Sequence, residues 1–200
     1  MIKYCSVESA ACIMDVLGPA WAFEMLQFIS REIELADNLV DDSKIVLEFW
    51  ERLRGGRMAP AWADIDLMNL PLHVIPRIVV LDVVQDPLDF VYRFFGTTHA
   101  STHGYDLTGK SISKLTPDDY AKITFEQYRA TLEAKAPRLF FQQFPTKPDV
   151  WCNCETIRLP LYADGQSVDK IMAMETILDD RTVLPRYFEV GKQPFNPPTR

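Results

Sequence analysis

Five strand-like segments, interrupted once by a long helical segment, constrain the fold of this chain most strongly. The strands are predicted at 78–84, 89–95, 139–144, 151–161 and 168–177. The first two flank a turn at 85–88 and predict a β-hairpin, and a helix is expected between about 117 and 135. A doubly wound parallel sheet requires strands that alternate with helices. This order therefore predicts an α+β fold, with a five-stranded antiparallel sheet and helices on one face.

The second predicted strand, 89–95, carries bulky side chains on both faces. Simple alternation places Phe90, Tyr92 and Phe94 on one face, and Val91, Arg93 and Phe95 on the other. The strand ends at Gly96, where a polar segment begins. Because both faces carry large groups, we expect both to be covered, and we expect any ligand to lie near this strand.

The first 42 residues are predicted to form a helical extension. One helix is expected over about 7–17, and a second, from Pro19 to about 36, carries a broad apolar stripe. Something must cover that stripe, either the chain's own domain or a dimer or partner surface. A further helix is expected to begin at about 41 and to lead the main domain, 43–180, before an irregular tail at 181–200.

Charge and hydropathy exclude several classes of partner. The formal net charge is −7 and no basic block is present, so binding to nucleic acid or to an anionic membrane is not expected. No run of 18 apolar residues predicts a membrane-spanning helix, and the N-terminus lacks the pattern of a signal peptide. We therefore expect a cytoplasmic protein without membrane insertion.

The four cysteines, Cys5, Cys12, Cys152 and Cys154, predict neither a metal site nor a disulfide. Cys152 and Cys154 are two apart in a predicted strand and share a face, which is poor geometry for a mutual disulfide. There is no Cys-x-x-Cys, and the histidines lie far from the cysteines in sequence, so zinc ligation is not predicted. Buried reduced thiols are expected instead.

The sequence also lacks motifs for hydrolysis or nucleotide binding. There is no Gly-x-Ser-x-Gly, and Gly96, Gly104 and Gly109 form neither a Gly-x-Gly-x-x-Gly nor a P-loop pattern. Turn geometry explains these glycines better. We therefore predict no enzymatic activity, and a small enzyme is kept only as a remote alternative.

Several motifs occur in a fixed order along the chain. They are Trp-x-x-Leu-Arg-Gly-Gly-Arg at 50–57, Asp-Ile-Asp at 64–66, Leu-Asp-Val at 81–83, Tyr-Arg-x-x-Gly-Thr at 92–97, Gly-x-Asp-Leu-Thr-Gly at 104–109 and Arg-Leu-Pro-Leu at 158–161. Over about 44–177 the chain resembles the type-5 PAS domain family of short bacterial stand-alone PAS proteins. It departs at Leu67, where the family often has Pro. The resemblance implies a sensory or interaction module and supplies no catalytic residues.

Alternation along the strands predicts where a ligand would lie. The candidate ligand-binding residues are Tyr92, Phe94, His99, His103, Phe125, Tyr128, Arg158, Met172 and Met174. Aromatic and Met side chains around a few polar groups are typical of a small-molecule pocket, and equally of a filled core. Of this set, Phe94 is favoured as a core residue, and Tyr92 and His103 are favoured as pocket-lining residues.

Two arginines, Arg93 and Arg158, are predicted in strands that are otherwise rich in apolar residues. An arginine in such a place must meet a carboxylate or an anionic ligand, because an unpaired buried charge is costly. A structural pair with Asp82, Asp106 or Glu155 is the favoured prediction, and an anionic ligand is the alternative.

No cofactor is assigned from the sequence. His99 and His103 are four apart and would share a helix face, so one could ligate haem, although pocket-lining histidines are favoured. A photoactive flavin needs a reactive Cys in the segment 97–110, which has none. We expect a stand-alone regulator that binds an unidentified small molecule, a signalling protein partner and a second copy of itself. A ligand-free adapter with a filled core is the alternative.

Overall fold

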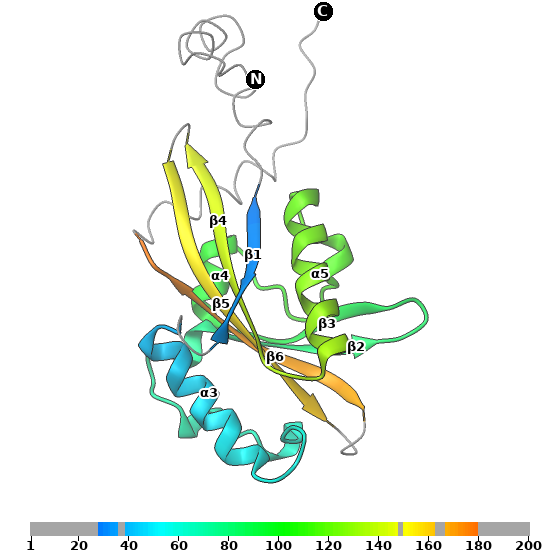
Figure 1. The fold of residues 1–200 in the computed structure, drawn as a ribbon. Coiled ribbons are helices and arrows are strands. Elements are labelled where there is room, and N and C mark those ends of the chain that lie inside the picture. The colour runs from blue at the N-terminus through cyan, green and yellow to red at the C-terminus, as the bar shows by residue number, and fades with distance from the viewer. Residues whose placement is uncertain (1–27, 36–38, 148–149, 163–166, 180–200) are drawn as a thin grey trace, which may run out of the picture.

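The computed structural model describes residues 28–35, 39–147, 150–162 and 167–179 (Figure 1). Within them, six strands form one antiparallel sheet in the order β1-β4-β5-β6-β2-β3. The strands are β1 (Ile29–Ile33), β2 (Ile78–Val84), β3 (Asp89–Phe95), β4 (Arg138–Lys147), β5 (Val150–Tyr162) and β6 (Val168–Ile177). The α-helices are α3 (Asp41–Arg54), α4 (Thr97–His103) and α5 (Asp118–Ala134).

The predicted α+β fold with an antiparallel sheet is confirmed. Strands β2 to β6 and helices α3 and α5 lie where the sequence places them, to within a few residues at each end. The expected helix over 7–17, part of the second helix, Cys5, Cys12 and the tail at 181–200 lie outside the described residues.

The sixth strand, β1, corrects one expectation. The second N-terminal helix was expected to continue to about 36, but Ile29–Ile33 is a strand that pairs with β4. Strand β4 would otherwise present an unpaired row of backbone groups at the edge of the sheet, and pairing with β1 satisfies them. The β-branched residues Ile29 and Ile33 are compatible with a strand, and the pairing with β4 decides for it.

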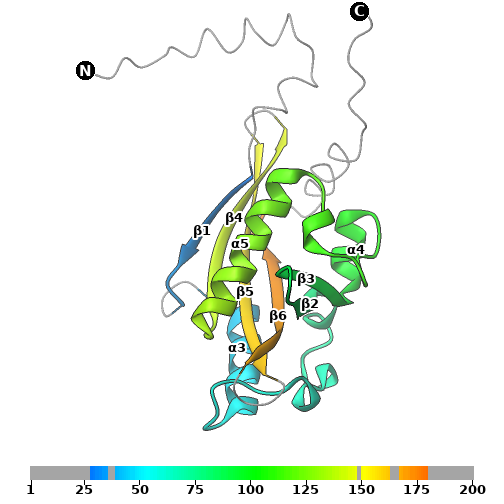
Figure 2. The same ribbon diagram turned by 90° about the vertical axis from the view of Figure 1, so that its right-hand side faces the viewer.

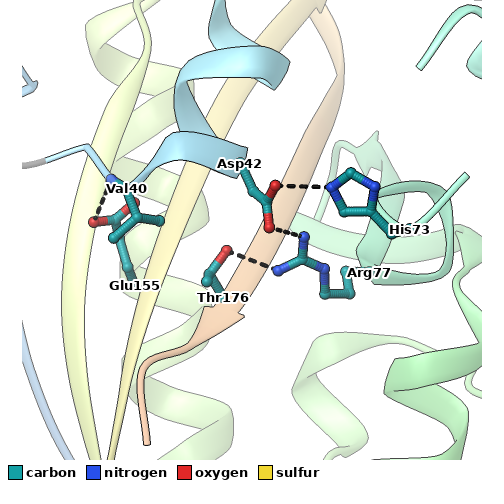
Figure 3. A network of polar contacts seen from close by, with 6 residues as sticks. All are labelled: Val40, Asp42, His73, Arg77, Glu155 and Thr176. Atoms are coloured by element: carbon teal, nitrogen blue, oxygen red, sulfur yellow. Dashed lines mark hydrogen bonds and ion pairs between the residues drawn. The ribbon is translucent and has the colours of Figure 1, made fainter. Parts of the chain in front are cut away.

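Helices lie against both faces of the sheet, which corrects the expectation that they gather on one face (Figure 2). Residues an odd number of positions apart in a strand point to opposite faces, so Glu155 and Arg158 on β5 identify the two sides. Arg158 bonds to helix α5, whereas the carboxylate of Glu155 accepts the backbone N–H of Val40, just before α3, at 3.3 Å (Figure 3). Trp50 fixes α3 to the second face, because its buried Nε1–H donates to the carbonyl oxygen of Pro160 at 2.8 Å.

A polar network holds the start of α3 against the chain that leads into β2 (Figure 3). Asp42 accepts from Nη2 of the buried Arg77 at 2.5 Å and contacts Nε2 of His73 at 2.9 Å. Arg77 also donates to Thr176 Oγ1 on β6 at 3.3 Å. Burial alone would raise the pKa of Asp42, but the hydrogen bonds from His73 and Arg77 lower it below its ordinary value.

Candidate functional site

A small cavity lies between the sheet and helices α4 and α5. Its free volume is about 20 Å³, which is room for about one water molecule. Its wall is formed by Val79, Tyr92, Phe95, His99, His103, Tyr120, Thr124, Tyr128, Gln142, Thr156, Arg158, Ala173 and Glu175. A ligand larger than one water molecule therefore requires these side chains to move. Several of the lining groups are polar, which distinguishes the site from an ordinary apolar core.

Strand β3 reaches the cavity through Tyr92 and Phe95, not Phe94. Leu81 pairs with Tyr92 while the preceding Val80 pairs with Phe94, so Arg93 is an extra residue in a β-bulge. The bulge shifts the alternation by one position. Phe94 therefore leaves the cavity face, which corrects its placement among the ligand-binding candidates, and Phe95 takes its place.

Helix α4 adds two histidines to the wall. Burial lowers the pKa of His99 to about 4, so the ring is neutral at pH 7. Its Nε2 lies 2.9 Å from the carbonyl oxygen of Arg77, and because a carbonyl only accepts, Nε2 carries the proton. His103 is buried and packs edge-on against Phe95, with ring centroids 5.5 Å apart. Both histidines therefore lie on the cavity side of the helix, as their i,i+4 spacing predicts.

The two arginines singled out by the sequence have different environments. Arg93 is exposed and pairs with Asp82 at 2.7 Å, which confirms the predicted structural pair. Arg158 is 3% exposed, and no carboxylate of the described residues lies within 4.0 Å of it. For Arg158 the predicted carboxylate pair is therefore wrong. Its guanidinium bonds to Gln127 and lies 3.7 Å from the ring centroid of Tyr128.

Gln127 on α5 is the hub of a buried hydrogen-bond network. Its Oε1 accepts from Arg158 Nε at 3.1 Å and from Gln142 Nε2 at 3.0 Å, and its Nε2 donates to Ser30 Oγ on β1 at 2.6 Å. Gln142 in turn accepts from Thr156 Oγ1 at 2.8 Å. Sequence reasoning missed this network. The only local signal was an amide side chain inside the aromatic strand β4.

Glu175 on β6 is the one carboxyl group in the cavity wall. Burial raises its pKa to about 7, although the positive charge of Arg158 acts in the opposite direction. Burial also raises the pKa of Tyr92 and Tyr120 well above their ordinary value, so both phenols stay neutral. Arg158 is thus the cavity's permanent charge, and Glu175 is close to half-protonated at neutral pH.

The match to a protein-family model agrees with this architecture. The model of the type-5 PAS family, described as a PAS domain, matches residues 40–174. The chain belongs to the PAS domain family. No curated protein matches it significantly. Among solved structures, an RNA-binding light-oxygen-voltage receptor superimposes with a TM-score of 0.40 and 9% identity, covering 82% of this chain. The chain spans 42% of that receptor's length.

Three further candidate residues do not line the cavity of the PAS domain. Met172 and Met174 flank Ala173, which lines the cavity, so both point to the opposite face, where α3 lies. The expectation that they share a pocket with Tyr92 is therefore corrected. Phe125 packs on Phe90 instead, with ring centroids 5.4 Å apart. The two methionines were misplaced because two-residue alternation along a strand does not say which face a ligand uses.

A larger hollow, the groove, lies on the PAS domain between β1, β4 and α5. It has a volume of about 340 Å³ and is lined by Ser30, Glu32, Lys122, Ile123, Glu126, Gln127 and Phe140. Gln127 is common to the groove and to the network around Arg158. The ring of Phe140 also lies between the two sites, with its centroid 5.8 Å from the Arg158 guanidinium carbon.

The remaining sequence predictions concern thiols, metals and membranes. Cys152 and Cys154 form no disulfide among the described residues, and both are fully buried, as expected. A hydrogen bond with Cys152, together with burial, raises the pKa of the Cys154 thiol. The part of the chain that the structure describes contains no group of three His, Cys, Asp or Glu side chains suited to hold a metal ion. None of the described helices has the length and apolarity needed to cross a membrane.

Proposed function

We propose that this PAS domain binds a small molecule at the cavity and that occupancy changes its affinity for a signalling protein. Membership of the family supports a sensory or regulatory role in general. The observation that carries the more specific proposal is Arg158, a buried cation in a polar cavity without a carboxylate partner among the described residues. A ligand that supplies a counter-charge to Arg158 would gain more binding free energy than a ligand that only contacts a filled apolar core.

Two chains of contacts support transmission from the cavity to the N-terminal side of the domain. One runs from Arg158 through Gln127 to Ser30 on β1. The other runs from His99 through Arg77 to Asp42 at the start of α3. A ligand that prefers one arrangement of these contacts shifts the population of β1 and α3, and with it the surface offered to a partner.

Native mass spectrometry of the full chain, purified without added ligands, tests this function. We expect a bound small molecule that is lost on denaturation, and slower hydrogen exchange in the cavity wall of the loaded protein. The same preparation in a thermal-shift screen of small metabolites should show a higher Tm with a subset of them. Absence of bound mass together with no effect of any metabolite would contradict a sensing role.

The small free volume of the cavity favours a second candidate, a ligand-free interaction adapter. About 20 Å³ is far below the roughly 300 Å³ of an ordinary small-molecule site, so the described side chains nearly fill their own core. An adapter would capture protein partners with the same affinity in the presence and absence of metabolites. Comparing partner capture by the full chain under both conditions separates the two functions.

The assembly state and location of the protein also belong to this proposal. We propose a homodimer that uses the segment before residue 43, and action in the cytoplasm, where buried reduced thiols such as Cys154 persist. We propose no catalytic role. Light scattering of the full chain over a range of concentrations would measure the mass expected for two copies, and a monomer at all concentrations would contradict the dimer.

A further inference from the structure

The contact between Arg158 and Gln127 has the geometry of a carboxylate site. Arg158 presents Nε and Nη2, the side edge of its guanidinium, to the single oxygen Oε1 of Gln127. Oε1 also accepts Gln142 Nε2 at 3.0 Å. An amide oxygen has two lone pairs, whereas a carboxylate offers about four acceptor sites and binds guanidinium through two parallel hydrogen bonds. Three donors therefore converge where a carboxylate would satisfy them better.

The charge of Arg158 also favours an anionic ligand. The side chain is buried, and its described neighbours are the neutral amide of Gln127 and the aromatic rings of Tyr128 and Phe140. Cation–π contact stabilises a buried guanidinium only in part. Glu175 lies on the same face but beyond ion-pair distance, and burial keeps its carboxyl partly protonated at pH 7. An anionic ligand would supply the missing counter-charge.

The groove provides both a route and space for the rest of such a ligand. Its volume of about 340 Å³ is at the lower end of ordinary small-molecule sites, roughly 300–1,000 Å³. Ile123 and Phe140 give it apolar wall, and Gln127 separates it from Arg158. Movement of this amide side chain past the neighbouring Phe140 ring would expose the guanidinium to the groove.

We propose that the groove binds a small monocarboxylate with an apolar body, whose carboxylate displaces the Gln127 amide from Arg158. This inference rests on the proposed function and names its ligand class. On the rim, Glu32 already pairs with Arg138 and Glu126 with Arg129, so these two arginines are not available to a second carboxylate of the ligand. Displaced from Arg158, Gln127 no longer holds Ser30 in its present position, and β1 loses this side-chain hydrogen bond to α5.

Phenylacetate and its neutral isostere phenylacetamide test the ligand class on the full-length wild-type protein. By calorimetry we expect phenylacetate to bind in the micromolar to millimolar range, and phenylacetamide to bind at least about tenfold more weakly. In hydrogen exchange, phenylacetate should speed exchange in Ile29–Ile33. Equal affinities for the acid and the amide would overturn the proposal.

Two matched variants test the position of the carboxylate. Gln127→Glu places the protein's own carboxylate on Arg158, so phenylacetate should no longer raise the Tm. Gln143→Glu makes the same change of charge on β4, where Gln143 bonds to Asn153, and should keep wild-type affinity. Wild-type binding by Gln127→Glu would overturn the proposal. A Tm increase with phenylacetamide or phenethylamine but not with phenylacetate would also overturn the proposal. That result would not contradict the proposed function, the binding of a small molecule.

Discussion

His99 and Arg77 join the two faces of the sheet. The Nε2–H of His99, on the cavity side, donates to the carbonyl oxygen of Arg77 at 2.9 Å. The guanidinium of the same Arg77 lies on the other side, where it pairs with Asp42 at the start of α3. A change in the position of α4 therefore acts on a residue that also fixes α3, because the backbone and the side chain of Arg77 carry the two contacts.

Replacement of Arg77 by Leu should destabilise the domain. The change removes a partly buried ion pair and the bond to Thr176, and leaves Asp42 without its main counter-charge. We expect a loss of about 2–3 kcal/mol in the free energy of unfolding, measured by urea denaturation. His73→Ala is the control, because His73 contacts the same carboxylate from a 62% exposed position and should cost under about 0.5 kcal/mol. Equal costs would show that Arg77 is not the anchor.

Gly96 lies too close to the backbone of Pro76 and Ile78 to carry a side chain. A Cβ there would lie 2.3 Å from the carbonyl oxygen of Pro76 and 2.6 Å from that of Ile78, and both are backbone atoms. Gly96→Ala should therefore cost about 3 kcal/mol in the free energy of unfolding. Gly56→Ala meets nothing within 4 Å and should change stability by under about 0.5 kcal/mol. A Gly96→Ala protein as stable as Gly56→Ala would contradict this close approach.

The strands and the helix order could be predicted because their signals are local. The hairpin of β2 and β3 follows from two apolar runs around a turn, and α5 from its acidic start at Asp118 and Asp119. Strand β1 could not be predicted in the same way. Ile29 and Ile33 fit a helical stripe as well as a strand, and only the edge of β4, more than a hundred residues later, decides between them.

The site was predicted less completely because its geometry depends on contacts between distant segments. The bulge at Arg93 exchanges Phe94 for Phe95, and a sequence does not show an extra residue in one strand of a pair. Gln127 is another example, since an amide on an amphipathic helix gives no sign that it meets Arg158. Tyr92 and His103 could be placed, because alternation and the i,i+4 spacing are local rules.

The thiols of Cys152 and Cys154 should resist alkylation in the folded protein. Both are fully buried, and the pKa of Cys154 is raised by its hydrogen bond with Cys152 and by burial, which suppresses the reactive thiolate. With iodoacetamide at pH 8 we expect both sites to react at least about a hundredfold more slowly than in urea-unfolded protein. Mass spectrometry of peptides measures each site separately, and rapid labelling of native Cys154 would contradict its burial.

Glu175 should make stability depend on pH. Burial raises its pKa to about 7 from the ordinary value of 4.5, so the folded protein holds this proton more tightly than the unfolded chain does. The resulting stability is fully present below pH 4.5 and is lost as the pH rises through 7. Between pH 6 and 8 the expected loss from this group is about 1 kcal/mol in the free energy of unfolding.

The Glu175→Gln variant separates the pH dependence of stability due to Glu175 from the opposite pH dependence due to His99. Burial lowers the pKa of His99 to about 4, so its contribution is present above 6.5 and is lost as the pH falls. Because His99 is the same in both proteins, it cancels in the difference between wild type and variant. Urea unfolding should show wild type losing about 1 kcal/mol relative to Glu175→Gln from pH 6 to pH 8. A constant difference would place the pKa of Glu175 outside this range.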